Sequence, residues 1–304
     1  MLLLSEWKKE KETLHHLSQI LGKYKLESRF KEPQWAHVIL DVNTVGFTTG
    51  ILFYNDTTYE IAVNLRDDRI EVITENETEY ITLEDGKSIK DYYLAIDKIL
   101  LKNGIIVNIN KKPQEVPDKT LFDEDIDHHH YNSEISKKFL KIMHFGLKAL
   151  SKFISPYRTR KVKPGLFWGT FDISCLINYN QLQKSFDESM VIEHNAFDEH
   201  FIEFGFWFGD DNFKGPTFFI LPHPFLGDDF NRNVKLPEGG YFYEPLKEFM
   251  FEFDKLDDKT AKNIVEFLRI GYKEFKTYLN WNDGGYCSIP LNIKDNEMEL
   301  NCEF

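Results

Sequence analysis

The sequence predicts an α+β fold made of two antiparallel β-meanders, each flanked by long helices and packed as one compact unit. Three observations lead to this prediction. Helical and strand segments come in sequential blocks, without strict alternation and parallel crossovers. The connections between strand segments are short, which favours antiparallel pairing. The order long helix, proline, aromatic-rich strand, further strands and helix occurs twice and indicates an internal duplication.

The first half is predicted over residues 1–110. Ser5 is the expected cap of a first helix, whose apolar positions repeat every three or four residues. Strands are then predicted at 35–43, 47–54, 59–65, 69–74 and 79–83. Ser88 and Asp91 have the spacing of a capping box, and the helix that they start ends at Gly104.

The second half is predicted over residues 133–281, after an acidic, proline-containing connection at 111–132. It opens with a long helix over 133–153 and closes with another over 258–279. The strands between them are predicted at 167–179, 201–208, 217–221 and 248–253, with a hairpin turn at 209–212. Residues 282–304 are predicted to form a C-terminal tail.

The composition limits the classes of function. The chain of 304 residues carries 37 Lys and Arg against 50 Asp and Glu, for a formal net charge of −13. This balance argues against general nucleic-acid binding, which needs cationic groups to displace counterions. No apolar stretch approaches the roughly 18 residues of a membrane-spanning helix, and no signal-peptide core is found near the start. Three scattered cysteines do not make a disulfide framework. We therefore expect a cytoplasmic protein without nucleic-acid or membrane partners.

The opening strands of both halves carry unusual polar faces. Alternation places Trp35 and His37 on one face of the first strand, and Trp168, Thr170 and Asp172 on one face of the other. A face that mixes Trp with polar groups favours a ligand pocket with aromatic walls. A solvated sheet face edged by Trp explains the same pattern, and the sequence leaves both interpretations open.

His37 has no carboxylate partner on its own predicted strand, because Asp41 lies four residues away, or roughly 13 Å. If the two halves pair, Asp172 is the natural partner. General acid–base catalysis by His37 and Asp172 is therefore an alternative to simple binding. This alternative requires the two side chains within hydrogen-bond reach, directly or through one water.

A polar stripe runs along the first predicted helix. His15, Gln19 and Lys23 are spaced four residues apart and lie away from the leucine face. Such donors suit an anionic or carbonyl ligand above the sheet. An ordinary solvated face gives the same spacing, so both interpretations stand.

Two further segments have candidate chemistry. In the run at 122–131, His128 and His130 are about 6.6 Å apart if extended, and neighbouring aspartates would complete a transition-metal site. An acidic loop before a helix N-terminus explains the same run. A basic segment either seats a phosphate or forms a helix end and loop; its members are Lys152, Arg158, Arg160, Lys161 and Lys163.

Several motifs together resemble a bacterial family without an assigned activity, domain of unknown function 5996. The matching segments are Thr13 to His15, Gln19 to Lys23, Trp35 to Thr49, Glu115 to Asp118, Phe122 to Tyr131, Phe167 to Asp172, Gly205 to Trp207 and Phe267 to Trp281. They cover nearly the whole chain, from residue 7 to residue 282. The resemblance implies no particular reaction.

The resemblance does imply a set of site residues. They are His15, Gln19, Lys23, Trp35, His37, Thr48, Thr49, His128, Trp168, Thr170 and Asp172. His129 and His130 fall outside the motifs, which leaves His128 as the candidate metal ligand of its run.

We expect the protein to bind a small aromatic or anionic molecule. The walls of its pocket would be Trp35, Trp168 and Trp207. The polar groups would be His15, Gln19, Lys23, Thr48, Thr49 and Thr170. An enzyme that uses His37 and Asp172 is the first alternative, and a non-catalytic protein-interaction module is the second. The sequence identifies no cofactor.

Overall fold

The computed structural model describes residues 2–184 and 186–291, which form two compact units. The N-terminal unit comprises Leu2–His144 and Gly165–Asp172, and the C-terminal unit comprises Phe145–Pro164 and the described residues from Ile173 onward. Helices and antiparallel sheets occur together, which confirms the predicted α+β class. The described residues contain no helix that is long and apolar enough to cross a membrane.

The units differ from the predicted halves, which were divided at the 111–132 connection. The chain instead passes from one unit to the other within a helix, after His144, and residues 165–172 return to the N-terminal unit. Residues 292–304, which form most of the predicted tail, lie outside the described residues, as does Cys302.

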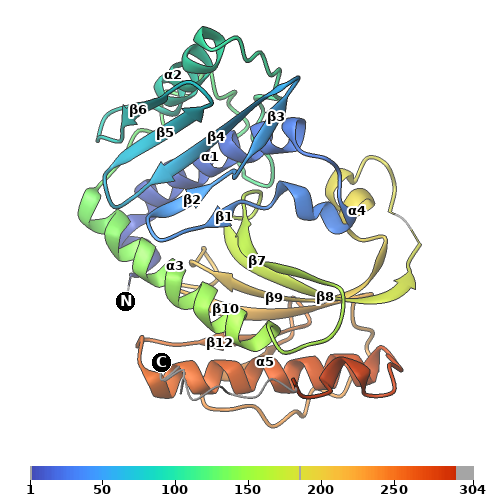
Figure 1. Cartoon of the computed structure of the whole chain (residues 1–304). Helices are drawn as coiled ribbons and strands as arrows, with labels where there is room; N and C mark the ends of the chain where they lie inside the picture. The colour runs from blue at the N-terminus through green and yellow to red at the C-terminus, as the bar shows by residue number, and fades with distance from the viewer. Residues whose placement is uncertain (1, 185, 292–304) are drawn as a thin grey trace, which may run out of the picture. The chain divides into compact units, whose positions relative to one another are not determined.

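The N-terminal unit contains a sheet in the order β1-β2-β4-β5-β6, with β3 also paired to β4. Its elements are α1 (Leu4–Ser28), the 3-10 helix η1 (Pro33–Val38), β1 (Asp41–Val42), β2 (Gly46–Thr48), β3 (Leu52–Tyr54), β4 (Thr57–Asn64), β5 (Arg69–Thr74), β6 (Thr78–Thr82) and α2 (Ile89–Lys102). Helix α1 contacts β3 and α2, and α2 contacts β5 and β6 (Figure 1).

Strong periodic patterns gave the correct elements in this unit. Strands β4 to β6 pair in antiparallel register, as the alternation predicted. The capping box of α2 is confirmed, because Asp91 N–H donates to Ser88 Oγ and the Ser88 N–H donates to Asp91. The predicted cap of α1 is wrong: the helix begins at Leu4, so Ser5 lies inside its first turn.

The predicted strand over 35–43 is wrong for its first half. Gln34 and Trp35 both have a φ of 53°, in the left-handed region, and the chain forms η1 there. The Glu32 N–H donates to Nδ1 of His37 at 3.1 Å, which folds the segment back on itself. Trp35 and His37 therefore do not share one face of a strand.

Two other predicted strands are interrupted. The 47–54 segment divides into β2 and β3 around Gly50, which has a φ of 62°. The 167–179 segment contains a turn, because Phe171 has a φ of 59° and its N–H donates to the Phe167 carbonyl. Trp168 and Thr170 lie in this turn, while Asp172 begins the next strand, so the three do not share a strand face.

The C-terminal unit is built on a sheet in the order β11-β12-β10-β9-β8-β7. The elements after α2 are α3 (Ser133–Ile154), β7 (Lys161–Phe167), β8 (Asp172–Leu182), α4 (Val191–Ala196), β9 (Glu199–Trp207), β10 (Thr217–His223), β11 (Gly240–Tyr243), β12 (Glu248–Glu252), α5 (Asp258–Tyr278) and the 3-10 helix η2 (Tyr286–Ser288). Their first members, α3, β7 and β8, are shared between the units.

Helix α5 lies along β9, β10 and β12 (Figure 1). It approaches the sheet closely at Gly271, where a Cβ would lie 2.2 Å from the Ile220 side chain. The hairpin predicted between β9 and β10 is confirmed, and its turn is closed by Asp210, which accepts from the Phe213 N–H at 2.8 Å. Most Phe side chains of these strands are buried, as the alternation predicted.

Candidate functional site

The predicted polar stripe of α1 contacts two loops of the N-terminal unit. Nε2 of His15 lies 3.1 Å and 2.9 Å from the carbonyl oxygens of Trp168 and Gly169. Desolvation lowers the pKa of His15 to about 3, so the ring is neutral and carries its proton on Nε2, facing these acceptors. Gln19 forms two hydrogen bonds with the main chain of Gln114, at 2.7 and 2.8 Å. The hydrogen bonds of His15 and Gln19 therefore hold these two loops against α1.

Lys23 is the most unusual member of the stripe. It is 2 % exposed, and its ammonium donates to Oε1 of Gln114 at 2.6 Å. The same ammonium lies 5.4 Å from the ring centre of Trp168. Burial lowers the pKa of Lys23 to about 8, with a small opposing contribution from Glu27. Nε1 of Trp168 is also buried and has no hydrogen-bond partner among the described residues.

The remaining predicted polar residues of this unit have local partners. Thr170 Oγ1 donates to Asp172, which is buried beside the turn. Thr48 donates to Glu60 at 2.5 Å, and Thr49 Oγ1 accepts from the Ile61 N–H at 3.0 Å. The two threonines therefore complete the sheet where β2 ends.

The proposed catalytic pair is not joined by a direct hydrogen bond in the part of the chain that the structure describes. His37 is buried, and its Nδ1 accepts from Glu32, while its Nε2 has no partner among these residues. Burial lowers the pKa of His37, and the charge of Glu32 opposes this shift. Trp35 is half-buried in the same 3-10 helix. Acid–base catalysis by His37 and Asp172 stays a prediction.

Trp207 belongs to the C-terminal unit, whereas the other predicted wall residues, Trp35 and Trp168, belong to the N-terminal unit. Its ring packs at 6.1 Å from Phe213 and 5.7 Å from Phe219, in an aromatic cluster on the sheet. The structure thus explains Trp207 by packing within its own unit.

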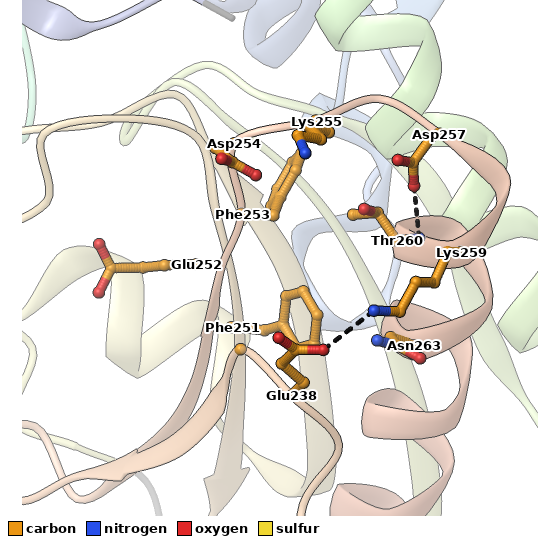
Figure 2. Close-up of a pocket in the computed structure, with 11 residues that line it drawn as sticks. Glu238, Phe251, Glu252, Phe253, Asp254, Lys255, Asp257, Lys259, Thr260 and Asn263 are labelled. Atoms are coloured by element: carbon orange, nitrogen blue, oxygen red, sulfur yellow. Dashed lines mark hydrogen bonds and ion pairs between the residues drawn. The ribbon is translucent and has the colours of Figure 1, made fainter.

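One cavity of the C-terminal unit lies between β12, the loop after it and the start of α5 (Figure 2). It has a volume of about 550 Å³ and is lined by several charged side chains. Lys259 pairs with Glu238 at 3.1 Å, and Asp257 accepts from the Thr260 N–H at 2.8 Å as the cap of α5. Three of the charged groups that line this cavity therefore already have partners within the protein.

Two other cavities of this unit share Tyr157 as a lining residue, and we call them the Tyr157 cavities. Their volumes are about 630 and 800 Å³. The first is lined by Tyr157, Arg269, Tyr272, Lys273, Lys276, Thr277, Asn280, Trp281, Asn282 and Ser288. The second is lined by Tyr157, Arg158, Thr159, Arg160, Asn178, Tyr179, Asn180, Asp283, Tyr286 and Cys287.

Buried polar atoms without partners line both Tyr157 cavities. Both side-chain polar atoms of Asn178, the hydroxyl of Tyr272 and Nε1 of Trp281 form no hydrogen bond within the described residues. These three residues are only 2 %, 4 % and 7 % exposed. A buried polar group gains free energy from a hydrogen-bond partner, so a ligand in these cavities would gain affinity by binding to these atoms.

The cavities are also rich in positive charge. Among the described residues, five Arg and Lys side chains and one carboxylate line the two cavities together, in a chain whose net charge is −13. Lys276 pairs with Asp283 at 2.7 Å, and Arg160 pairs with Glu199. Arg269 and Lys273 are exposed and form no ion pair with any described carboxylate. They are therefore available to an anion.

Sequence analysis missed most of this site. The basic segment at 152–163 identified Arg158 and Arg160, but α5 supplies the other cations. Their spacing was a usable signal, because Arg269, Lys273 and Lys276 recur at helical intervals and share a face.

Comparisons with known proteins place the chain in a family. No curated protein and no solved structure gives a significant match. The family of unknown function DUF5996 matches residues 1–286, which is nearly the whole chain of 304 residues. The chain therefore belongs to the DUF5996 family.

Proposed function

We propose that the protein binds a small anionic molecule that carries a planar ring, in the Tyr157 cavities. The observation that carries this proposal is the set of buried polar atoms without partners on Asn178, Tyr272 and Trp281. A ligand with both donors and acceptors would satisfy them and recover the free energy that their burial costs.

The charge of the cavity lining supports an anionic ligand. Arg269 and Lys273 project from one face of α5 without carboxylate partners among the described residues. Arg158 donates to the main-chain carbonyls of Ile289 and Pro290, at 3.2 and 3.3 Å, and pairs with no carboxylate of the described residues. Guanidinium groups suit carboxylates and phosphates, which accept two hydrogen bonds at once.

The aromatic lining supports a planar ring. Tyr157 and Tyr272 meet edge to face at 4.7 Å, and the rings of Tyr179 and Trp281 are stacked at 5.0 Å with an angle of 9°. Aromatic walls with a few polar groups are typical of small-molecule sites. A reducing compartment such as the cytoplasm suits the free thiol of Cys287, which lines one cavity.

Three probes separate the two features of the ligand. Inorganic phosphate offers charge alone, adenosine offers a planar ring alone, and adenosine 5′-monophosphate offers both. We expect the nucleotide to raise the unfolding temperature more than either other probe, and to change the fluorescence of Trp281. Charge reversal in the double variant R269E/K273E should remove most of the nucleotide effect.

Lys262 provides the matched control, because it is an exposed lysine of α5 that lines neither Tyr157 cavity. K262E should leave the nucleotide effect unchanged. The proposal is wrong if none of the three probes stabilises the wild-type protein, or if K262E weakens the effect as much as R269E/K273E does.

A further inference from the structure

A second candidate site lies in the N-terminal unit, away from the residues used above. His16 of α1 lies beside Asp125 and His128 of the connection before α3. One potential ligand atom from each of the three residues lies within 4.8 Å of the others. The rings of His16 and His128 are stacked, with their centres 3.9 Å apart.

The hydrogen bonds of His16 leave one of its nitrogens ready for a ligand. Nδ1 lies 2.8 Å from the main-chain carbonyl of Glu12, which only accepts, so Nδ1 carries the proton. Nε2 then presents its lone pair. This atom is buried in a residue that is 3 % exposed, and it has no partner among the described residues. Histidine ligands of metals are commonly oriented in this way, by a carbonyl on the other nitrogen.

His128 is oriented by a carboxylate. Its Nδ1 lies 2.8 Å from Oδ2 of Asp125, and the hydrogen bond with Asp125 raises the pKa of the ring. Asp125 is 1 % exposed and also accepts from the main-chain N–H groups of Asp127 and His128, at 3.1 Å each. The loop therefore holds Asp125 in place with little freedom.

Asp118 adds negative charge to the same place. Its Oδ1 accepts two hydrogen bonds from Thr120, at 2.8 and 2.7 Å, whereas Oδ2 accepts none from the described residues. The charges of His16 and His128 both act on this carboxylate. Two imidazoles and two carboxylates form a donor set of the kind that holds Zn²⁺ and similar transition metals.

We propose that His16, Asp125 and His128 bind a divalent transition-metal ion of the Zn²⁺ type, with Asp118 beside it. The ion takes the place of the proton that Nδ1 of His128 shares with Oδ2 of Asp125, and this proton leaves to solvent. Ligand atoms around a tetrahedral Zn²⁺ lie about 3.4 Å apart, so small side-chain rotations bring this set onto an ion. A structural hydrogen bond alone explains Asp125 and His128, but it leaves Nε2 of His16 unexplained.

The test uses the full chain, purified without a histidine tag and stripped with EDTA. Titration with Zn²⁺ should show one ion bound per chain, and Co²⁺ should give the visible absorption of a site with nitrogen and oxygen ligands. His16→Phe keeps a ring beside His128 but removes the ligand nitrogen, and it should weaken Zn²⁺ binding by about 100-fold or more. Asp125→Asn and His128→Phe should weaken it comparably.

The histidine run supplies the matched control. His129 and His130 follow His128 directly, and their rings are partly exposed and pack on each other at 4.4 Å. His130→Ala should leave the Zn²⁺ affinity within about twofold. Circular dichroism in EDTA checks that each variant folds, and His128→Ala replaces any variant that does not. A wild-type chain that binds no Zn²⁺, or an equal loss in H130A and H16F, overturns the proposal.

Discussion

The indole ring of Trp168 lies directly on Gly22 of α1. A Cβ atom at position 22 would lie 2.2 Å from Cγ of Trp168, closer than real Cβ contacts allow. Glycine in the middle of a helix normally costs about 1 kcal/mol relative to alanine. A glycine is nevertheless present at position 22, because the ring of Trp168 occupies the space that a side chain would need.

Gly22→Ala should therefore destabilise the protein, although alanine is the better helix former. Overpacking of this kind costs about 1–3 kcal/mol, which exceeds the gain in helix propensity. Urea unfolding measures the difference. In a W168A background the ring is gone, so the same G22A change should become neutral or stabilising. An equal effect of G22A in both backgrounds would contradict the contact.

Lys23 should give the protein a characteristic dependence on pH. Burial lowers its pKa from 10.5 to about 8 in the folded state. Between these values the unfolded chain binds more protons, so the free energy of unfolding rises as the pH increases from 8 to 10.5. Lys23→Met should remove this rise and stabilise the protein most below pH 8.

The control for Lys23 is Lys98→Met, which changes an exposed lysine of α2. Unfolding temperatures from pH 7 to 10.5 compare the three proteins. The K98M profile should run parallel to the wild type, whereas the K23M profile should be flatter. Parallel profiles for all three would show that Lys23 keeps an ordinary pKa in the folded protein.

The cap of α5 offers a second local test. Asp257 accepts a hydrogen bond from the Thr260 N–H at 2.8 Å (Figure 2). Asp257→Ala should cost about 1 kcal/mol of stability, because it leaves a helix N–H group without this acceptor. Asp258→Ala removes a neighbouring carboxylate of the first turn without removing the cap. If the two changes cost the same in urea unfolding, charge at the helix terminus explains the effect of Asp257.

Local sequence patterns predicted the elements whose conformation is set locally. Strands β4 to β6 follow from alternation, and α2 follows from Ser88, Asp91 and its apolar periodicity. Helices α3 and α5 follow from periodicity over about six turns or more. In each case the pattern is long enough to outweigh any single contact made with the rest of the chain.

Trp35 and Phe171 show why other elements were missed. Both have a positive φ, which no local pattern of their neighbours predicts. The segment around Trp35 is fixed by distant groups, since the buried ammonium of Lys25 donates to the Ile39 carbonyl at 2.5 Å and to Asp41 at 3.3 Å. Alternation arguments fail where tertiary hydrogen bonds of this kind decide the backbone.

The candidate sites were predictable only in part for the same reason. His128 was identified from the run at 122–131, whereas its partner His16 was not. The polar stripe predicted on α1 includes the neighbouring residue, His15. His16 is identified only by the folded structure, in which its ring stacks on that of His128 with the ring centres 3.9 Å apart. Similarly, Tyr157 and Arg269 line one cavity, although more than a hundred positions of the sequence separate them.

Glu248 should give a pH dependence of the opposite sign to that of Lys23. This residue of β12 is 8 % exposed, and burial raises its pKa from 4.5 to about 8. Between these values the folded state binds more protons than the unfolded chain, so the free energy of unfolding falls as the pH rises from 4.5 to 8. Glu248→Gln, which stays neutral, should remove this fall and raise the unfolding temperature above pH 8.

Glu266→Gln, at an exposed position of α5, should leave the profile unchanged. A Glu248→Gln profile that keeps the wild-type slope would mean that Glu248 ionises at its ordinary pH in the folded protein.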